Sequence, residues 1–416
     1  MCIRDRPPCE PANVKFIASP ELTQACQQFG QVFLQQISPE KCYATGKGLE
    51  VTEIGERATA VLHVVDNIGK ACTTPVDILT CELVSEMTGK KIDCSVKKTE
   101  TSQYEISYQP TSRGRHHLHI NVDGEHIKGS PFAVTVTLPI QKLGTPIKTI
   151  TGLKGPWGVA VSQTGDVIVA EGTGHCISIF SPVGEKIQSF GSQGSGHGQF
   201  SHPHGVAVDG DGNILVADRW NYRIQKYTYN SNFIRAVGKK GNNPLEFNSP
   251  MGIAVHPHNK KVYIADNNNH RIQILNPDLT FSSSFGSHGK NNGQFNNPYD
   301  VAFDSTGNVY VADMDNRRIQ VFTAEGEFLR KFGKKGSGNG ELLYLTSISI
   351  DSDNVVYVAE HDNHCVSVFT CEGNILTSFG TRGSGPGQFN KPRGIAVDKN
   401  GVVYVCDDGN NRLQLF

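Results

Sequence analysis

The chain has 416 residues, with 39 basic and 40 acidic residues and a formal net charge of −1. This balance excludes a histone-like protein or one dominated by an acidic tail, and the length suffices for two or three domains. No apolar run approaches the roughly 18 residues of a membrane helix, so no membrane span is expected. The first ten residues, MCIRDRPPCE, contain no apolar segment of a signal peptide. They show no core periodicity either, which leaves open whether they are the natural start.

The 11 cysteines are scattered singly, and none forms a CxxC pair. A zinc knuckle is therefore not expected. Cys42, Cys72, Cys81 and Cys94 fall in one region, where sequence alone does not exclude a disulfide. Without a secretion signal, we expect free thiols in the reducing cytoplasm.

The chain begins with a segment, residues 1–39, that differs in pattern from the rest. Within it, 13–37 are rich in Gln with spaced Leu, Phe and Val, and we expect the end of a coiled-coil helix. Residues 40–138 contain the alternating runs TAVLHVVD, YEISYQP, HHLHINV and PFAVTVTL, separated by turns. About a hundred residues of short strands at this spacing predict a β-sandwich. We expect GEHIKGSPFAVTV (124–136) to be its final hairpin.

Residues 144–416 contain a repeat that is marked by a proline. It stands at Pro156, Pro203, Pro250, Pro298 and Pro392, with Leu345 in the fifth copy, so the spacings are 47, 47, 48, 47 and 47 residues. A period of roughly 40 to 50 residues is typical of four-stranded propeller blades. Six copies therefore predict a six-bladed β-propeller.

One copy shows how a blade is built. GVAVD (205–209) and ILVAD (214–218) read as strands joined by the tight turn GDGN. RIQKY (223–227) is a third strand, and a fourth ends in an aromatic residue and Gly in copies such as IQSFG (187–191) and FLRKFG (328–333). The sixth copy stops at Phe416 after its third strand, while PIKTITG (146–152) matches a fourth strand. We therefore expect this N-terminal strand to complete the last blade and remove an open sheet edge.

The loops between the second and third strands follow a rule. They read EGTGHC, DRWNYR, DNNNHR, DMDNRR, EHDNHC and DDGNNR. A loop that begins with Asp ends with Arg, and a loop that begins with Glu ends with Cys. This predicts structural ion pairs between Asp218 and Arg223, Asp266 and Arg271, Asp313 and Arg318, and Asp407 and Arg412. Five of the six loops share an Asn, and Asn221, Asn269, Asn316, Asn363 and Asn410 are expected to form local backbone hydrogen bonds.

Residues that differ between copies are the candidates for a partner surface. Strand parity places these loops and the links between blades on one face. Aromatic, Arg and Met side chains are enriched in interface cores. The candidates for a partner or RNA surface are Trp157, His204, Arg219, Trp220, Tyr222, Met251, His270, Tyr299, Met314, Arg317, His361, His364 and Arg393. Each of them is also compatible with an ordinary solvated loop position.

Two known families share these patterns. The frame P-x-G-V-A-V-D, G-N-I-x-V-A-D and N-x-R-I-Q is similar to the NHL repeat, and CYATGKGLE with YEISYQPTSRGRHHLHINVDGEHIKGSPF resembles a filamin-type immunoglobulin repeat. Their order resembles the C-terminal half of TRIM-NHL proteins, tripartite-motif proteins related to RING-type E3 ubiquitin ligases. The resemblance implies an all-β chain: a filamin, Ig-like sandwich at 40–138 and an NHL β-propeller at 144–416.

The zinc-binding RING and B-box modules of that family have no counterpart in this sequence. Zinc is therefore implied only for modules outside the chain, as are ubiquitin transfer and oligomerisation through a coiled coil. For this chain we expect no cofactor, no metal and no catalytic residue. What the resemblance implies is recognition of a protein substrate or adaptor, or of RNA.

Three functions remain open. The sequence slightly favours protein over RNA, because residues 144–416 hold 24 basic and 24 acidic residues and RNA affinity requires a basic surface. Trp157, Trp220 and Tyr222 nevertheless offer faces on which bases stack. A metal-dependent propeller hydrolase is the third alternative, and its ligands would converge in the central channel from Glu171, His175, His204, Asp300, Glu360 and His364.

Overall fold

The computed structural model describes residues 37–53, 55–86, 89–100, 103–111, 114–137, 144–338 and 340–416. The expected coiled-coil end within 1–39 lies almost wholly outside these residues. The chain divides into two compact units, Met1–Val136 and Thr137–Phe416. In the described ranges, no helix combines the length and the apolar character needed to cross a membrane.

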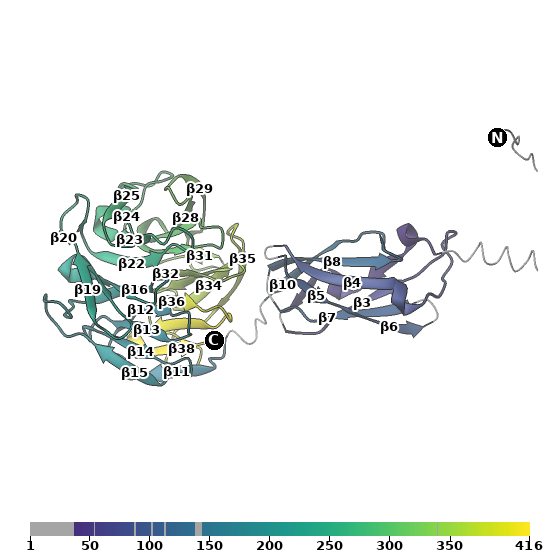
Figure 1. Ribbon diagram of the computed structural model, residues 1–416, viewed down its shortest axis with the longest axis horizontal. Coiled ribbons are helices and arrows are strands. Elements are labelled where there is room, and N and C mark those ends of the chain that lie inside the picture. The colour runs from purple at the N-terminus through teal and green to yellow at the C-terminus, as the bar shows by residue number, and fades with distance from the viewer. Residues whose placement is uncertain are drawn as a thin grey trace, which may run out of the picture. The chain divides into compact units, whose positions relative to one another are not determined.

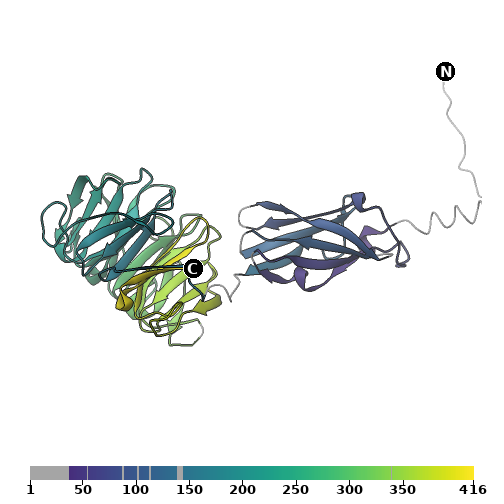
Figure 2. The same cartoon turned by 90° about the horizontal axis from the view of Figure 1, so that it is seen from below.

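The first unit is a sandwich of two antiparallel sheets. One sheet has the order β1-β3-β7-β6, and the other has the order β2-β10-β8-β4-β5, with β9 beside β8. Their elements are η1 (Pro39–Lys41), β1 (Tyr43–Thr45), η2 (Lys47–Leu49), β2 (Val51–Glu53), β3 (Ala58–His63), η3 (Val76–Ile78), β4 (Leu79–Ser85), β5 (Lys91–Asp93), β6 (Ser95–Glu100), β7 (Gln103–Tyr108), β8 (Gly114–Val122), β9 (Glu125–His126) and β10 (Phe132–Thr137). In the perpendicular view these strands form two facing layers (Figure 2).

Alternation along the strands builds the core of the sandwich. Ala58, Ala60 and Leu62 of β3 point inward and are buried, while the residues between them are more exposed. The expected final hairpin at 124–136 is wrong. Both of its strands, β9 and β10, pair with β8 instead of with each other.

The second unit has six four-stranded sheets arranged around an axis (Figure 1). Blades one to three are β12 (Pro156–Val161), β13 (Val167–Glu171), β14 (Cys176–Phe180) and β15 (Lys186–Phe190); β16 (Pro203–Val208), β17 (Ile214–Asp218), η4 (Arg219–Asn221), β18 (Arg223–Tyr227) and β19 (Phe233–Val237); and β22 (Pro250–Val255), β23 (Val262–Asp266), η5 (Asn267–Asn269), β24 (Arg271–Leu275) and β25 (Phe281–Phe285).

Blades four to six follow the same plan. They are β26 (Pro298–Phe303), β27 (Val309–Asp313), η6 (Met314–Asn316), β28 (Arg318–Phe322) and β29 (Phe328–Phe332); β32 (Leu345–Ile350), β33 (Val356–Glu360), β34 (Cys365–Phe369) and β35 (Ile375–Phe379); and β36 (Pro392–Val397), β37 (Val403–Asp407), η7 (Asp408–Asn410) and β38 (Arg412–Leu415) with β11 (Lys148–Thr151). Two links carry short parallel pairs, β20 (Lys239–Lys240) with β21 (Glu246–Phe247) and β30 (Lys334–Lys335) with β31 (Glu341–Leu342).

The sixth blade takes its outer strand from the start of the unit. Lys148 to Thr151 of β11 pair antiparallel with Leu415 to Arg412 of β38. The innermost strand β36 of this blade also packs against β12 of the first blade. Hydrogen bonds therefore join the two ends of the repeat array, in the arrangement that the sequence led us to expect.

Candidate partner-recognition face

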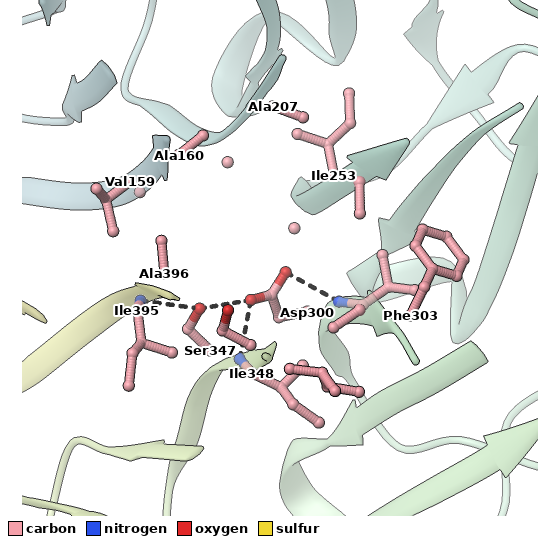
Figure 3. Close-up of a pocket in the computed structure, with 18 of the residues that line it drawn as sticks. Val159, Ala160, Ala207, Ile253, Asp300, Phe303, Ser347, Ile348, Ile395 and Ala396 are labelled. Atoms are coloured by element: carbon pink, nitrogen blue, oxygen red, sulfur yellow. Dashed lines mark hydrogen bonds between the residues drawn. The ribbon is translucent and has the colours of Figure 1, made fainter. Parts of the chain in front are cut away.

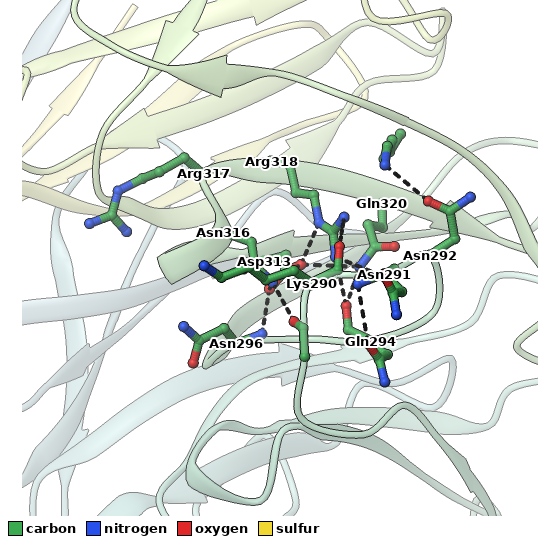
Figure 4. A network of polar contacts seen from close by, with 12 residues as sticks. Lys290, Asn291, Asn292, Gln294, Asn296, Asp313, Asn316, Arg317, Arg318 and Gln320 are labelled. Carbon is green, nitrogen blue, oxygen red and sulfur yellow. Dashed lines mark hydrogen bonds and ion pairs between the residues drawn. The ribbon is translucent and has the colours of Figure 1, made fainter.

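A buried carboxylate organises the loop between β27 and β28 (Figure 4). Asp313 ends one strand and Arg318 begins the next, so the two residues are directly opposite each other in the sheet register. Arg318 Nε donates to Asp313 Oδ2 at 2.7 Å. The same oxygen accepts from Asn316 Nδ2 at 2.9 Å and from Gln320 Nε2 at 3.1 Å. One carboxylate thus holds three side chains of its own blade.

The same network holds the link that leads into the blade. Asp313 Oδ1 accepts the backbone N–H of Asn296 at 2.8 Å. The Arg318 guanidinium donates to the carbonyls of Lys290, Asn291 and Gln294 at 2.8 to 2.9 Å. Because the link and the loop bind through these contacts, both lie on one face of the propeller.

All four predicted ion pairs are present in the structure. The other three are Arg223–Asp218 and Arg271–Asp266 at 2.8 Å and Arg412–Asp407 at 2.7 Å, and in each the Asp side chain is fully buried. Burial raises the pKa of Asp218 and Asp313, although the Arg and Asn side chains and a backbone N–H oppose this shift. The ion pairs are therefore part of the framework of the blades.

The frame Asn residues have a different role from the expected one. Asn316 Nδ2 donates to the carboxylate of its own loop and also to the carbonyl of Gly289, in the link 27 residues earlier. Asn221, Asn269 and Asn410 repeat both contacts. These residues connect the loop to the link, and the local backbone bonds that the sequence suggested are not their contacts.

Two blades carry Glu at the position of the buried Asp. Ser367 hydroxyl donates to Glu360 Oε1, and Asn363 donates to Glu360 Oε2 at 2.6 Å. In the first blade, Ser178 donates to Glu171 in the same way. The Ser occupies the position at which the Asp blades carry Gln. The side chain of Glu is one methylene longer, so it reaches the short Ser, whereas Asp requires the longer Gln.

Some of the candidate histidines join neighbouring blades. His270 has a left-handed backbone conformation, and its Nδ1 accepts the N–H of Asn297 at 3.1 Å. His364 accepts the N–H of Lys391 in the same way, at 3.1 Å. His175 does so for His202, at 3.2 Å. Predicting His270 and His364 as partner contacts overlooked this structural use of the ring nitrogen.

Several other candidates are buried at the mouth of the central channel. Each innermost strand begins with the frame proline or Leu345, and the next residue of each blade contacts its counterparts in other blades. These residues are Trp157, His204, Met251, Tyr299, Thr346 and Arg393. The partner-surface candidates that are buried are Trp157, His204, Met251, Tyr299 and Met314. Placing them on an exposed surface was wrong, because the six strands converge there and their side chains fill the mouth.

Polar contacts cross this mouth between blades. His204 Nε2 and the Tyr299 hydroxyl are 2.9 Å apart, and Arg393 Nη1 donates to the same hydroxyl at 2.9 Å. Arg393 Nε donates to Asp408 Oδ2 at 2.7 Å, and Trp157 Nε1 donates to Asp408 Oδ1 at 3.2 Å. Burial lowers the pKa of His204 well below its usual value, with Arg219 and Arg393 adding to this effect. His204 is therefore neutral.

Behind the mouth lies a cavity of about 410 Å³ that the innermost strands line. Asp300 points into it and occupies the position at which four other blades carry Gly (Figure 3). Its carboxylate accepts from Ser347 Oγ at 2.5 Å and from the N–H groups of Ile348 and Val301. Burial raises the pKa of Asp300 to about 6. A Cβ at Gly252 would lie 2.0 Å from Asp300 Oδ1, so these strands need Gly where they approach most closely.

Few of the candidates remain accessible. Trp220 is 51% exposed, and Arg219, Tyr222, Arg317, His361 and Arg393 are half-buried. Arg317 points away from the Asp313 network (Figure 4). His361 Nδ1 lies 2.7 Å from Asp362, and Lys240 lies over the Tyr222 ring. Trp220 is thus the most exposed of the candidate side chains. Sequence reasoning missed His202, which packs against Trp220 with centroids 3.7 Å apart.

The candidate ligands of a hydrolase do not converge. Glu171 and Glu360 bind Ser side chains within their own blades, His175 and His364 accept backbone N–H groups, and only His204 and Asp300 line the cavity. Among the residues that the structure describes, no three His, Cys, Asp or Glu side chains group as metal ligands. Burial, followed by Glu360, raises the pKa of Cys365 to about 12, so its thiol stays protonated.

Comparison with protein families agrees with both units. The filamin/ABP280 repeat matches residues 36–133, and the NHL repeat matches 153–180, 200–227, 247–275 and 389–416. A 6-bladed beta-propeller family matches 290–363. The chain therefore combines a filamin repeat with a propeller of NHL repeats.

Relatives place this combination in a known class. The E3 ubiquitin-protein ligase TRIM71 of Xenopus tropicalis is 36% identical over 150 residues, covering 34% of this chain and 18% of that protein. Tripartite motif-containing protein 2 of Rattus norvegicus is 30% identical over 227 residues, covering 43% of this chain and 30% of that protein. The matched part is thus less than a third of either relative. With both repeat families present in this order, the chain corresponds to the filamin and NHL part of TRIM-NHL proteins, as the sequence patterns indicated.

A likeness to a solved structure concerns the fold alone. A protein of unknown function from Bacteroides thetaiotaomicron is similar at a TM-score of 0.54 and 13% identity, covering 92% of this chain and 98% of that chain. Identity at this level supports the architecture and carries no activity.

Proposed function

We propose that this chain is the partner-recognition region of a RING-type E3 ubiquitin ligase and binds protein targets through the loop face of its propeller. The exposed side chain of Trp220 carries this proposal. The frame residues on either side of it, Asp218 and Arg223, are committed to the fold, whereas Trp220 projects from the same loop without such a role. Exposed Trp with neighbouring Tyr and Arg is typical of interaction hot spots.

The filamin sandwich then acts as a spacer and a second protein-binding module. Ubiquitin transfer would be the work of a RING module and is not assigned to any residue of this chain. The relatives named as E3 ligases support this division, because this chain itself matches the filamin and NHL repeat families.

RNA is the second candidate ligand for the same face. Trp220 packs against His202, and Lys240 lies over the Tyr222 ring at 5.3 Å, so aromatic surfaces with a cation are available to stack on bases. The equal numbers of acidic and basic residues in the propeller favour protein, since RNA affinity depends on a basic surface.

Affinity capture with the full chain tests the proposal. Wild-type protein is compared with a Trp220→Ala/Tyr222→Ala variant, before and after RNase treatment of the lysate. We expect protein targets that the variant loses and RNase does not release. A matched control is Ile187→Ala/Ile234→Ala, which removes exposed apolar side chains from the outer strands and retains binding. Targets that RNase releases would favour RNA, and equal capture by both variants would contradict a role of the loop face.

A further inference from the structure

Arg219 is a half-buried cation without a carboxylate partner. It begins η4, and its Nε donates to Ser249 Oγ of the next blade at 2.9 Å. No carboxylate of the described residues pairs with it, whereas Arg317 pairs with Asp315 at 3.3 Å and Arg393 with Asp408 at 2.7 Å. Buried charges in proteins are usually paired. An unpaired guanidinium at this position therefore marks a place for an anion.

The surroundings of Arg219 do not supply that anion. Burial is the main cause that lowers the pKa of Arg219, and the nearby charge of Arg393 also lowers it. The carboxylates at the mouth are already bound: Asp315 to Arg317 and Asn297, Asp362 to His361, and Asp408 to Arg393 and Trp157. The deeper Asp300 is bound to Ser347 and two backbone N–H groups. Arg219 therefore has no carboxylate of its own at the mouth, because each carboxylate named here is bound to another group.

An aromatic wall lies beside this cation. Trp220 packs against His202, whose ring lies 5.7 Å from that of Trp157, and Trp157 in turn contacts His204. The wall runs from an exposed side chain to buried ones at the channel mouth. Buried His202 Nδ1 has no hydrogen-bond partner in the structure. An aromatic surface and one unpaired polar atom, His202 Nδ1, thus lie near Arg219.

We propose that the mouth of the propeller, between Arg219 and Trp220, binds an acidic side chain of a protein partner. The carboxylate pairs with the Arg219 guanidinium, whose planar fork suits two parallel hydrogen bonds, and a neighbouring residue of the partner packs on Trp220. This inference rests on the proposed function and specifies the chemistry of its ligand. A peptide is favoured over RNA because one unpaired guanidinium matches one carboxylate, whereas a chain of phosphates needs an extended basic surface.

Tryptophan fluorescence tests this proposal directly. The chain has 2 tryptophans, and both Trp157 and Trp220 lie at the mouth. The full chain is titrated with hexaglutamate, hexaglutamine and the RNA hexauridylate. We expect a saturable change in emission with hexaglutamate and none with hexaglutamine. Arg219→Gln weakens the hexaglutamate affinity at least about tenfold, which corresponds to roughly 1.4 kcal/mol.

Arg235→Gln is the matched control. It removes the same charge from an exposed position of the same blade, so it changes the affinity less than about twofold if binding is local. Arg219→Lys keeps the charge without the fork and gives an intermediate affinity, and thermal unfolding shows that each variant is folded.

Three results would overturn the proposal. Equal losses in Arg219→Gln and Arg235→Gln would show unspecific attraction, equal binding of hexaglutamine would remove the role of the carboxylate, and tighter binding of hexauridylate would assign the site to phosphate. If targets captured from the lysate need Trp220 while Arg219→Gln retains them and hexaglutamate does not bind, the proposed function stands and this inference alone fails.

Discussion

Arg318 Nε donates to Asp313 Oδ2 at 2.7 Å across neighbouring strands, and both side chains are buried. The same carboxylate and guanidinium also bind the link into the blade at Asn296 and Gln294. A repeat that varies on its surface therefore keeps one polar network inside each of four blades. This network allows the loop between Asp313 and Arg318 to change sequence without changing position.

Asp313→Asn should destabilise the propeller. The variant leaves the buried guanidinium of Arg318 without its counter-charge, and removing one partner of such a pair costs about 3 kcal/mol or more. Chemical denaturation measures the free energy of unfolding. Asp211→Asn, in the exposed turn of another blade, changes it by less than about 0.5 kcal/mol. Equal changes in the free energy of unfolding would show that the network contributes no more to stability than an exposed turn residue.

The two versions of the network should be exchangeable only as a set. In the fifth blade, Glu360→Asp alone shortens the side chain that reaches Ser367 and leaves a buried hydroxyl unpaired, at a cost of about 1 to 3 kcal/mol. Adding Cys365→Arg and Ser367→Gln recreates the residues of the Asp blades and recovers part of this loss. Thermal unfolding of the single and triple variants checks the order of stability. A triple variant less stable than the single one would contradict the coupling.

The histidine that joins the fifth blade to the sixth offers a milder test. His364→Ala removes the acceptor of the Lys391 N–H and should cost about 1 kcal/mol. His364→Asn should retain most of the stability, because Asn411 has the same backbone conformation and accepts the N–H of Gly155 at 3.1 Å. Measuring the free energy of unfolding of both variants tests this prediction. Equal losses in the two variants would mean that the side-chain acceptor is irrelevant.

Sequence patterns predicted the framework well because the framework repeats. The spacing of Pro203 and its counterparts gave six blades, and the co-occurrence of Asp218 with Arg223 gave the ion pairs. The role of Gln225 followed the same rule, since Gln accompanies Asp in four loops and Ser accompanies Glu in two. That signal was present in the sequence and was missed.

The candidate site was harder to predict because side chains at equivalent positions differ in direction. Trp157 and Trp220 are both aromatic residues near loops, but Trp157 follows the frame proline and is buried against His204, while Trp220 of η4 is exposed. Linear spacing does not show that six strands crowd the same mouth. The use of His270 Nδ1 as an acceptor depends on a neighbouring blade, and no local pattern reveals such a contact.

The stability of the propeller should depend on pH through Asp300. Burial raises its pKa from 3.8 to about 6, so the folded protein holds this proton more tightly than the unfolded chain. Protonated Asp300 therefore contributes fully to the free energy of unfolding at low pH, and this contribution is lost as the pH rises through about 6.

Asp300→Ser isolates this effect, because Ser347 occupies the same position in the fifth blade. The difference in unfolding free energy between wild type and variant is measured by denaturation from about pH 4 to 7. We expect wild-type stability to fall relative to the variant as the pH rises, by at most ~3 kcal/mol for a shift of this size. The opposite slope would mean that the hydrogen bonds from Ser347, Ile348 and Val301 outweigh burial and keep the carboxylate ionised in the cavity.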